Sequence, residues 1–277
     1  MAYIGFEIDG KRHIGQLDGE NVVPLGDIET FYADPAAASP QGEPVALANL
    51  TVVPFVPLTS RIFCVGINYH SHAAESKAAA GLDVPKFPMI FGRWEQSLVV
   101  DGTPVPVPPN EIGLDWEVEL AVVIGKKGWL ISEEEAMDHV LGFTVFNDLS
   151  ARKKQLETPQ FTLGKNADYS GPIGPVLKVA AEVGDVRNLK VQSRFNGEVM
   201  QEANTGDLIH SIERIISYIT DTVTLLPGDV IATGTPGGVG LGQNPPRYLQ
   251  PGDTIEVEVE NIGILRNPII SRSDLKA

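Results

Sequence analysis

The sequence predicts a mixed α/β protein that is mainly β and has only a few helices. Two dipeptides, Asp9-Gly10 and Asp18-Gly19, divide the first residues into short strands, because Asp-Gly favours tight β-hairpin turns. Apolar residues occupy every second position of 114–124, as expected for a strand with one buried face. Few segments show the spacing of apolar residues that is typical of helices.

The composition along the chain suggests two domains. Residues 33–44 (ADPAAASPQGEP) are rich in Ala, Pro and Ser and read as a surface loop. The apolar run RIFCVGINY, which starts at Arg61, reads as the first buried strand of a larger unit. We therefore expect a small β-rich N-terminal domain at 1–57 and a larger domain at 58–277.

The overall charge limits the classes of partner. The chain has 277 residues and a net charge of −15, which disfavours nucleic acid and anionic membrane surfaces as partners. Its single cysteine, Cys64, supports neither a disulfide framework nor a cysteine-based zinc site. No apolar stretch reaches the roughly 18 residues of a membrane helix. The first residues lack the pattern of a signal peptide, so a cytoplasmic location is expected.

The stretch 114–124 (LDWEVELAVVI) combines an apolar face with acidic residues. Its odd positions begin with three carboxylates, Asp115, Glu117 and Glu119. If these side chains point into the fold they need a cation, because an unpaired buried carboxylate is costly. Oxygen ligands of this kind suit hard divalent ions. The strand alone leaves open a second interpretation, an edge strand whose acidic face is solvated.

Residues 70–81 (HSHAAESKAAAG) are expected to form a helix that ends at Gly81. His72 and Glu75 are three residues apart, so they lie on one face of such a helix. A histidine held by a glutamate can act as a general base through water, although such pairs are also common as surface contacts. His70 is expected to face away from Glu75.

Several polar side chains follow or precede the predicted strands. A strand at 142–148 presents Asp148 at its end, and the next residues supply Arg152 and Gln155. Arg93 lies between aromatic residues and is either a packed side chain or a clamp for a substrate carboxylate. Lys165 is expected on a loop at 161–175, where it could pair with a substrate carboxylate.

Two further helices are expected. Ser132 and Glu135 form a capping-box pattern for a helix at 132–142. Asp207 is the expected N-cap of a helix that carries an apolar stripe as far as Ile219. Residues 225–240 read as a strand followed by a glycine-rich loop, which does not match a P-loop.

Six motifs occur in order: GINYHSHAAE, DWEVEL, NDLSAR, LGKNADYSGPIGP, LLPGDVIATGTPGGVG and LQPGDTIEVEVENIGILRNP. Together they resemble the fumarylacetoacetate hydrolase family over about residues 60–270. The resemblance implies a C-terminal mixed β-sheet roll with few helices. It also implies a site for Mg²⁺ or Mn²⁺, sometimes Ca²⁺, and usually a homodimer.

The resemblance also implies roles for individual residues. Glu117, Glu119 and Asp148 match the metal ligands, whereas Asp115 matches an acidic residue that the family does not use as a ligand. His72 and Glu75 match a lid dyad that activates water, and Lys165 matches a catalytic, substrate-binding lysine. Further substrate-binding candidates are Arg93, Arg152, Gln155 and Thr235. Two departures concern the substrate: Arg93 stands where many members have Lys, and Lys153-Lys154 replaces Asp-Leu.

These residues predict a divalent-metal-dependent hydrolase that cleaves a C–C bond in an acylpyruvate or a related 2,4-dioxo acid. The expected substrate is a small anionic 2-oxo acid or diketone. Three alternatives remain open: an oxaloacetate decarboxylase, an enol–keto isomerase of a ring-cleavage product, and a non-catalytic metal-binding homologue. A base in the lid argues against the last, because binding alone needs none.

Overall fold

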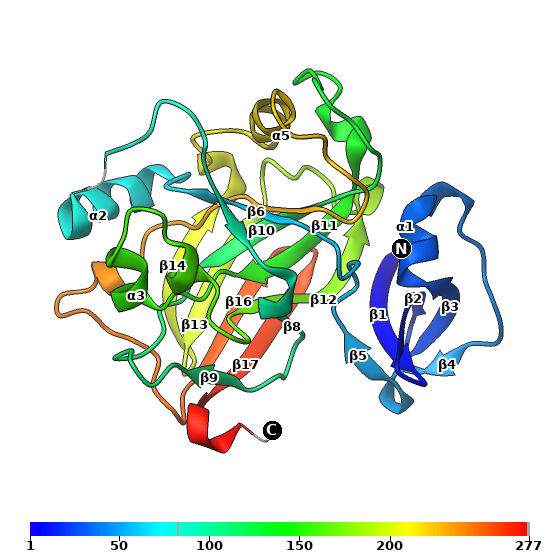
Figure 1. The fold of residues 1–277 in the computed structure, drawn as a ribbon, viewed down its shortest axis with the longest axis horizontal. Coiled ribbons are helices and arrows are strands. Elements are labelled where there is room, and N and C mark those ends of the chain that lie inside the picture. The colour runs from blue at the N-terminus through cyan, green and yellow to red at the C-terminus, as the bar shows by residue number, and fades with distance from the viewer. Residues whose placement is uncertain (82, 276–277) are drawn as a thin grey trace.

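The computed structural model describes residues 1–81 and 83–275. They form two β-sheets with short helices at the periphery (Figure 1), which confirms the mixed, mainly β architecture. The helices are α1 (Ile28–Ala33), α2 (His70–Ala80), α3 (Arg152–Leu156), α4 (Thr162–Lys165) and α5 (Ile212–Thr220).

The larger sheet has the strand order β4-β3-β2-β1-β12-β11-β10-β15-β6-β7, with β5 paired to β1 and β8 paired to β12. The smaller sheet has the order β14-β13-β16-β17-β9. The strands of the larger sheet are β1 (Ala2–Ile8), β2 (Lys11–Asp18), β3 (Asn21–Asp27), β4 (Val45–Ala46), β5 (Thr51–Val53), β6 (Ile62–Gly66), β7 (Met89–Arg93), β8 (Leu98–Val99), β10 (Val118–Ile124), β11 (Val140–Asn147), β12 (Gly171–Val179) and β15 (Val230–Ala232). Those of the smaller sheet are β9 (Val105–Val107), β13 (Lys190–Phe195), β14 (Glu198–Asn204), β16 (Thr254–Val259) and β17 (Gly263–Ser271).

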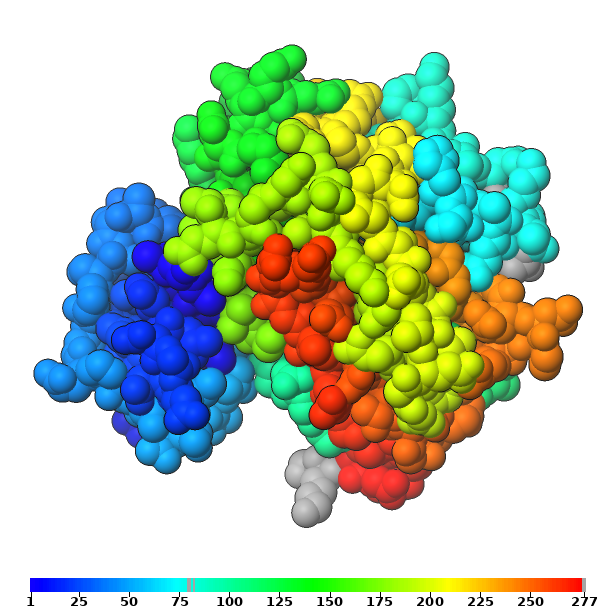
Figure 2. All heavy atoms as spheres, turned by 180° about the vertical axis from the view of Figure 1, so that it is seen from behind, coloured from blue at the N-terminus to red at the C-terminus, as the bar shows by residue number. Residues whose placement is uncertain are grey.

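The N-terminal strands follow the two predicted turns. Asp9 and Gly10 both have positive φ and join β1 to β2, whereas Gly19 takes the positive φ of the next turn. Figure 2 shows these first strands, in dark blue, as a lobe at one side of the molecule. β1 extends the larger sheet by pairing with β12, and the lobe shares an apolar core with β6 and β10. The domain boundary at residue 57 stays a prediction.

β10 lies in the interior of the larger sheet, between β11 and β15. The interpretation as a solvated edge strand was therefore wrong. Its odd apolar residues, Ala121 and Val123, pack in the core beneath the N-terminal lobe. The strand predicted over 114–124 is shorter in the structure, since β10 begins only at Val118. The even residues of the whole stretch nevertheless belong to the main core, where each fully buried aliphatic side chain contributes about 1.5–3 kcal/mol. These are Leu114, Trp116, Val118, Leu120, Val122 and Ile124.

Helix α2 agrees with the prediction. It spans His70–Ala80 and is closed by Gly81, whose left-handed backbone (φ +70°) lets its N–H return to the last turn. On its inner side Ala73 and Ser76 are buried, whereas His70 is exposed. In the described part of the chain, none of the helices combines the length and the apolar character needed to span a bilayer.

Three local predictions were wrong. Residues 132–142 form turns and a single 3₁₀ turn before β11 begins at Val140, because pairing with β10 claims the apolar residues of that segment. The N-cap of α5 is Ser211, which accepts the N–H of Arg214, and Asp207 ends a separate 3₁₀ turn. The segment 161–175 is not all loop, since it contains α4 and the start of β12.

Candidate metal and acid–base site

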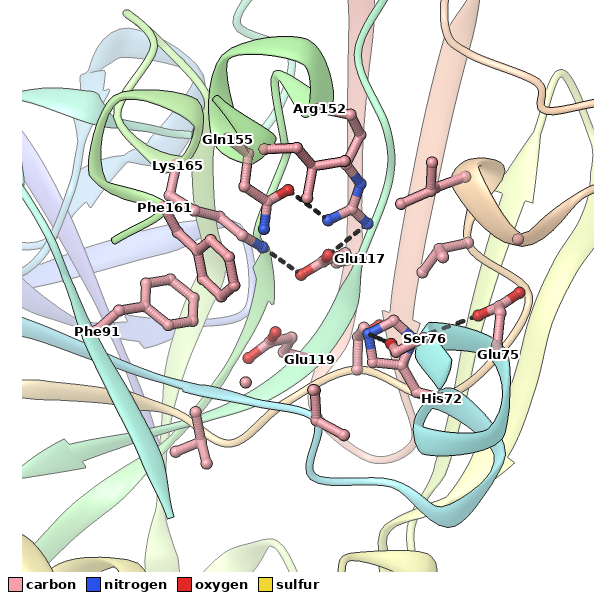
Figure 3. A pocket seen from close by; sticks show the side chains of 18 residues that line it. His72, Glu75, Ser76, Phe91, Glu117, Glu119, Arg152, Gln155, Phe161 and Lys165 are labelled. Atoms are coloured by element: carbon pink, nitrogen blue, oxygen red, sulfur yellow. Dashed lines mark hydrogen bonds and ion pairs between the residues drawn. The ribbon is translucent and has the colours of Figure 1, made fainter. Parts of the chain in front are cut away.

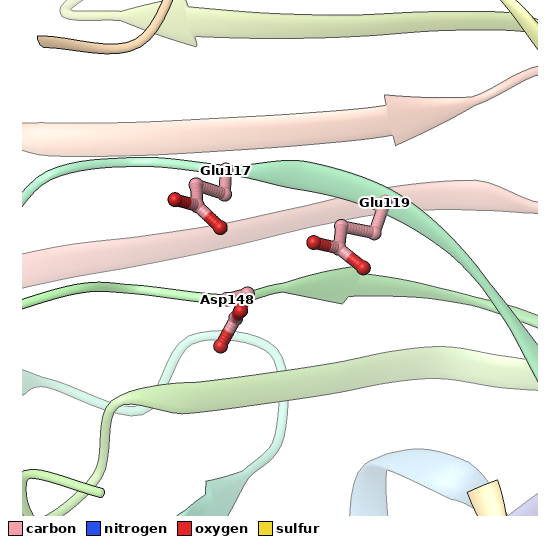
Figure 4. A group of neighbouring side chains, drawn as sticks. All are labelled: Glu117, Glu119 and Asp148. Carbon is pink, nitrogen blue, oxygen red and sulfur yellow. The ribbon is translucent and has the colours of Figure 1, made fainter. Parts of the chain in front are cut away.

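Three carboxylates meet where β10 begins and β11 ends. Glu117 and Glu119 are two residues apart and share one side of the chain, whereas Asp148 follows directly after β11. The antiparallel register aligns Val118 with Asn147, and the N–H of Asp148 donates to the carbonyl of Glu117 over 3.0 Å. The three side chains are buried, and ligand oxygens of all three lie within 4.8 Å of one another (Figure 4).

Three buried cations contact this cluster. The Lys165 ammonium donates to Glu117 over 2.6 Å and to Asp148 over 2.7 Å. Arg152 Nη2 donates to the other oxygen of Glu117 over 2.6 Å, and Arg93 Nε donates to Asp148 Oδ1 over 3.0 Å. The two arginines also have further partners, and Lys165 bridges Glu117 and Asp148, so the cluster is a connected ion-pair network inside the protein.

The network leaves Glu119 without a cation among the described residues, and its one protein partner there is the Gly234 N–H at 2.8 Å. Burial, Asp148 and Glu117 together raise the pKa of Glu119 well above its ordinary value. Burial would also raise the pKa of Glu117, but Lys165 and Arg152 hold it far below its usual range. A negative charge on Glu119 is therefore uncompensated.

The donor set fits a hard divalent ion. Carboxylate oxygens are the ligands that Mg²⁺, Mn²⁺ and Ca²⁺ prefer. An ion held by Glu117, Glu119 and Asp148 would compensate the buried charge of Glu119, and it would share the other two carboxylates with Lys165. The structure thus brings together the three predicted ligands.

The predicted acid–base pair is also formed. His72 Nδ1 lies 3.2 Å from Glu75 Oε2, one helical turn along α2. On the other side of the ring, Ser76 Oγ lies 3.4 Å from His72 Nε2. Glu75 Oε1 also accepts the Gly238 N–H of the glycine-rich loop over 3.2 Å. When Nδ1–H donates to Glu75, Nε2 is left as the basic nitrogen.

The His72–Glu75 dyad and two of the three clustered carboxylates line one cavity (Figure 3). Glu117 and Glu119 line it, whereas Asp148 lies behind them, covered by Lys165 and Arg93. The cavity volume is about 50 Å³, which is room for only a few water molecules and favours a small substrate. Apolar side chains form the remaining wall: Val65, Ile67, Phe91, Leu156, Phe161, Val239 and Leu241.

The other predicted substrate-binding residues divide into two groups. Arg152, Gln155, Lys165 and Thr235 line the cavity, and Thr235 Oγ1 donates to the Val118 carbonyl over 2.9 Å. Arg93 does not line it. Its fully buried guanidinium holds Asp148, Ser170 and the Leu149 carbonyl, so of the two interpretations the packed side chain is correct and the substrate clamp is wrong.

Sequence reasoning missed several residues of the site. Ser76 is four residues after His72, so the spacing that paired His72 with Glu75 also indicates Ser76. Gly238 and Gly242 contact Glu75 from a loop more than 160 residues away. Phe91 and Phe161 pack edge to face at 6.2 Å beside Lys165, and no local pattern indicates that contact.

Comparisons with known proteins show the family of this chain. Residues 61–270 match the family described as fumarylacetoacetate (FAA) hydrolase, C-terminal. Oxaloacetate tautomerase FAHD2A of Homo sapiens is 42% identical over 233 residues, which is 80% of this chain and 73% of the relative. Oxaloacetate tautomerase YisK of Bacillus subtilis is 43% identical over 216 residues, which is 77% of this chain and 71% of the relative.

Solved structures show the same fold. The 2-hydroxyhepta-2,4-diene-1,7-dioate isomerase from Mycobacterium marinum has a TM-score of 0.83 at 29% identity, covering 99% of this chain and 100% of that chain. A fumarylacetoacetate hydrolase from Exiguobacterium antarcticum has a TM-score of 0.80 at 33% identity, covering 98% and 100%. The protein belongs to the fumarylacetoacetate hydrolase family of enzymes.

Proposed function

We propose that this protein is a divalent-metal-dependent tautomerase that interconverts the enol and keto forms of a small 2-oxo dicarboxylic acid, with oxaloacetate as the first candidate. The observation that carries this proposal is a single cavity in which the His72–Glu75 dyad faces the acidic cluster. Relatives over 40% identical are named oxaloacetate tautomerases. Mg²⁺ or Mn²⁺, a homodimer and a cytoplasmic location are part of the same proposal.

The bound ion would supply Lewis acidity at the 2-oxo group. His72 Nε2 takes the proton from C3 of the keto form, and the C2 oxygen gains a proton, so water is neither consumed nor released. Glu75 orients the imidazole and stabilises its protonated form through Nδ1. Lys165 and Arg152 place positive charge beside the reacting oxygens, where it stabilises the negative charge that develops.

Hydrolysis of an acylpyruvate or a related 2,4-dioxo acid is the second candidate. The observation that favours it is the likeness to a solved structure titled fumarylacetoacetate hydrolase. In that reaction His72 would deprotonate a water molecule that attacks the distal carbonyl. The C–C bond would then break, and the products would be the 2-oxo acid and a second acid from the acyl group. The same dyad serves both reactions, so the products decide between them.

The test is an assay of oxaloacetate and a panel of acylpyruvates with Mg²⁺ or Mn²⁺. Tautomerisation predicts faster loss of the ultraviolet absorbance of the enol than with metal alone, without CO₂ or pyruvate. Pyruvate with a second acid would select hydrolysis, and CO₂ would select decarboxylation. His72→Ala is the loss-of-base variant, and His70→Ala is its matched control because that side chain is exposed on the same helix. An enol decay equal to that with metal alone would refute the tautomerase proposal.

A further inference from the structure

Asp115 is a fully buried carboxylate that the reaction described above does not use. Its Oδ1 accepts the N–H groups of Trp116 over 2.8 Å and Gly240 over 2.6 Å. Its Oδ2 accepts the Leu241 N–H over 3.0 Å and Arg152 Nε over 2.7 Å. All four partners are donors, so the position requires an acceptor-only group, and an ionised carboxylate is one.

One set of these contacts connects Asp115 to the proposed metal ligand Glu117. Arg152 Nε is held by Asp115, and its Nη2 donates to Glu117 Oε1 over 2.6 Å. A planar guanidinium that is fixed at one end has little freedom at the other. Asp115 therefore orients the Glu117 carboxylate through one intervening side chain, Arg152, whose Nη1 also donates to Gln155 over 2.8 Å. Partners that orient ligands in this way tune metal affinity.

A second set of contacts connects Asp115 to α2, the helix that carries the His72–Glu75 dyad. Asp115 holds Gly240 and Leu241, and the neighbouring Trp116 donates its indole N–H to the Gly238 carbonyl over 3.0 Å. The loop fixed in this way presents two N–H groups to α2. Gly237 donates to Ser71 Oγ over 3.0 Å, and Gly238 donates to Glu75 Oε1 over 3.2 Å.

We propose that Asp115 is a positioning residue that aligns the two halves of the site, the metal ligand Glu117 through Arg152 and the His72–Glu75 dyad through the glycine-rich loop. The two halves come from segments far apart in the sequence, and Asp115 is a single carboxylate that touches the supports of both. The inference rests on the proposed metal site. It does not depend on which 2-oxo acid is the substrate.

The test variant is Asp115→Asn, which keeps the shape but turns an amide NH₂ toward donors on one side. We expect Mn²⁺ binding, measured by calorimetry on the metal-free protein, to weaken about 10- to 100-fold. Hydrogen exchange of the backbone amides of 71–76 is expected to speed up. Neither readout uses turnover, so failure of the tautomerase proposal and failure of this inference are separate results.

Asp229→Asn is the matched control. Asp229 is also buried and also accepts several donors, but these belong to Arg61 and Leu226 and not to Arg152 or the glycine-rich loop. This variant shows the effect of replacing a buried carboxylate with several hydrogen bonds elsewhere in the protein. It should leave both Mn²⁺ affinity and the hydrogen exchange of 71–76 at the wild-type level. The inference would be overturned if Asp115→Asn kept wild-type Mn²⁺ affinity and wild-type hydrogen exchange. It would also be overturned if Asp229→Asn changed both quantities as much as Asp115→Asn does.

If Asp115→Asn does not fold, two variants that leave Asp115 in place test the two sets of contacts separately. Arg152→Lys keeps the charge but loses the fork that joins Asp115 to Glu117, so it should weaken Mn²⁺ binding without changing exchange in α2. Trp116→Phe removes the donor to Gly238, so it should speed exchange in α2 at wild-type Mn²⁺ affinity. Any other pattern, including wild-type values in both variants, would contradict the proposed division.

Discussion

Gly242→Ala is the sharpest test of the acid–base pair, because the three atoms nearest to a Cβ at this position all belong to Glu75. Gly242 ends a 3₁₀ turn, and its backbone is outside the left-handed region, so alanine causes no backbone strain. A Cβ built on Gly242 would lie 1.8 Å from Glu75 Oε1, 2.1 Å from Cδ and 2.3 Å from Cγ. The Glu75 side chain cannot keep its position beside such a group.

The magnitude follows from these distances. Non-bonded heavy atoms need about 3.5 Å, so the Glu75 carboxylate must move by more than about 1.5 Å. It then loses its contact with His72 Nδ1 and its bond from the Gly238 N–H. A displacement of about 1 Å can cost roughly 10²-fold in rate, so we expect kcat to fall about 100-fold. Glu75 is a flexible side chain near the surface, so the free energy of unfolding should change by about 1 kcal/mol or less.

The assay is kcat for enol–keto conversion at saturating Mn²⁺, together with thermal unfolding. Gly92→Ala is the control, because a Cβ at Gly92 in β7 meets no atom within 4 Å. It should retain wild-type kcat and stability. A folded Gly242→Ala enzyme with wild-type kcat would show that the position of Glu75 in α2 is irrelevant to the chemistry, and it would refute the reasoning.

Three further predictions concern the same site. The first set of variants removes the charge of one proposed metal ligand at a time: Glu117→Gln, Glu119→Gln and Asp148→Asn. Each should abolish activity, and it should abolish metal binding in calorimetry, while the fold is kept. Wild-type metal affinity in a variant would exclude that residue as a ligand. His72→Ala should lower kcat about 10²–10⁴-fold with oxalate binding retained, Glu75→Gln should do so more mildly, and His70→Ala should be nearly neutral. Damage from His70→Ala alone would contradict the assignment of the base. Finally, oxalate with Mn²⁺ should slow hydrogen exchange in α2, as expected for a lid that orders over its ligand, and equal exchange in both states would argue against a lid.

Local patterns in the sequence were sufficient to predict those structural features that depend on a single segment of the chain. The alternation along 114–124 predicted that the even side chains share one apolar core, because successive side chains of a strand face opposite sides. The three-residue spacing placed His72 beside Glu75, because that spacing spans one helical turn. The Asp9-Gly10 turn and the Gly81 helix end were likewise predictable, since both depend on left-handed backbone that few residues adopt.

Only the tertiary structure decided how the segments meet. The capping-box pattern at Ser132 favours a helix, yet pairing with β10 draws Val140 and Leu141 into β11. The sequence left Arg93 as either a packed side chain or a substrate clamp, and the sheet buries it against Asp148. Asp115 resembles the two glutamates that follow it, and nothing local shows that its partners are Arg152 and the loop at Gly240. Hydrogen bonds and burial between residues far apart in sequence depend on which surfaces the packed sheets bring together, and no local pattern contains that information.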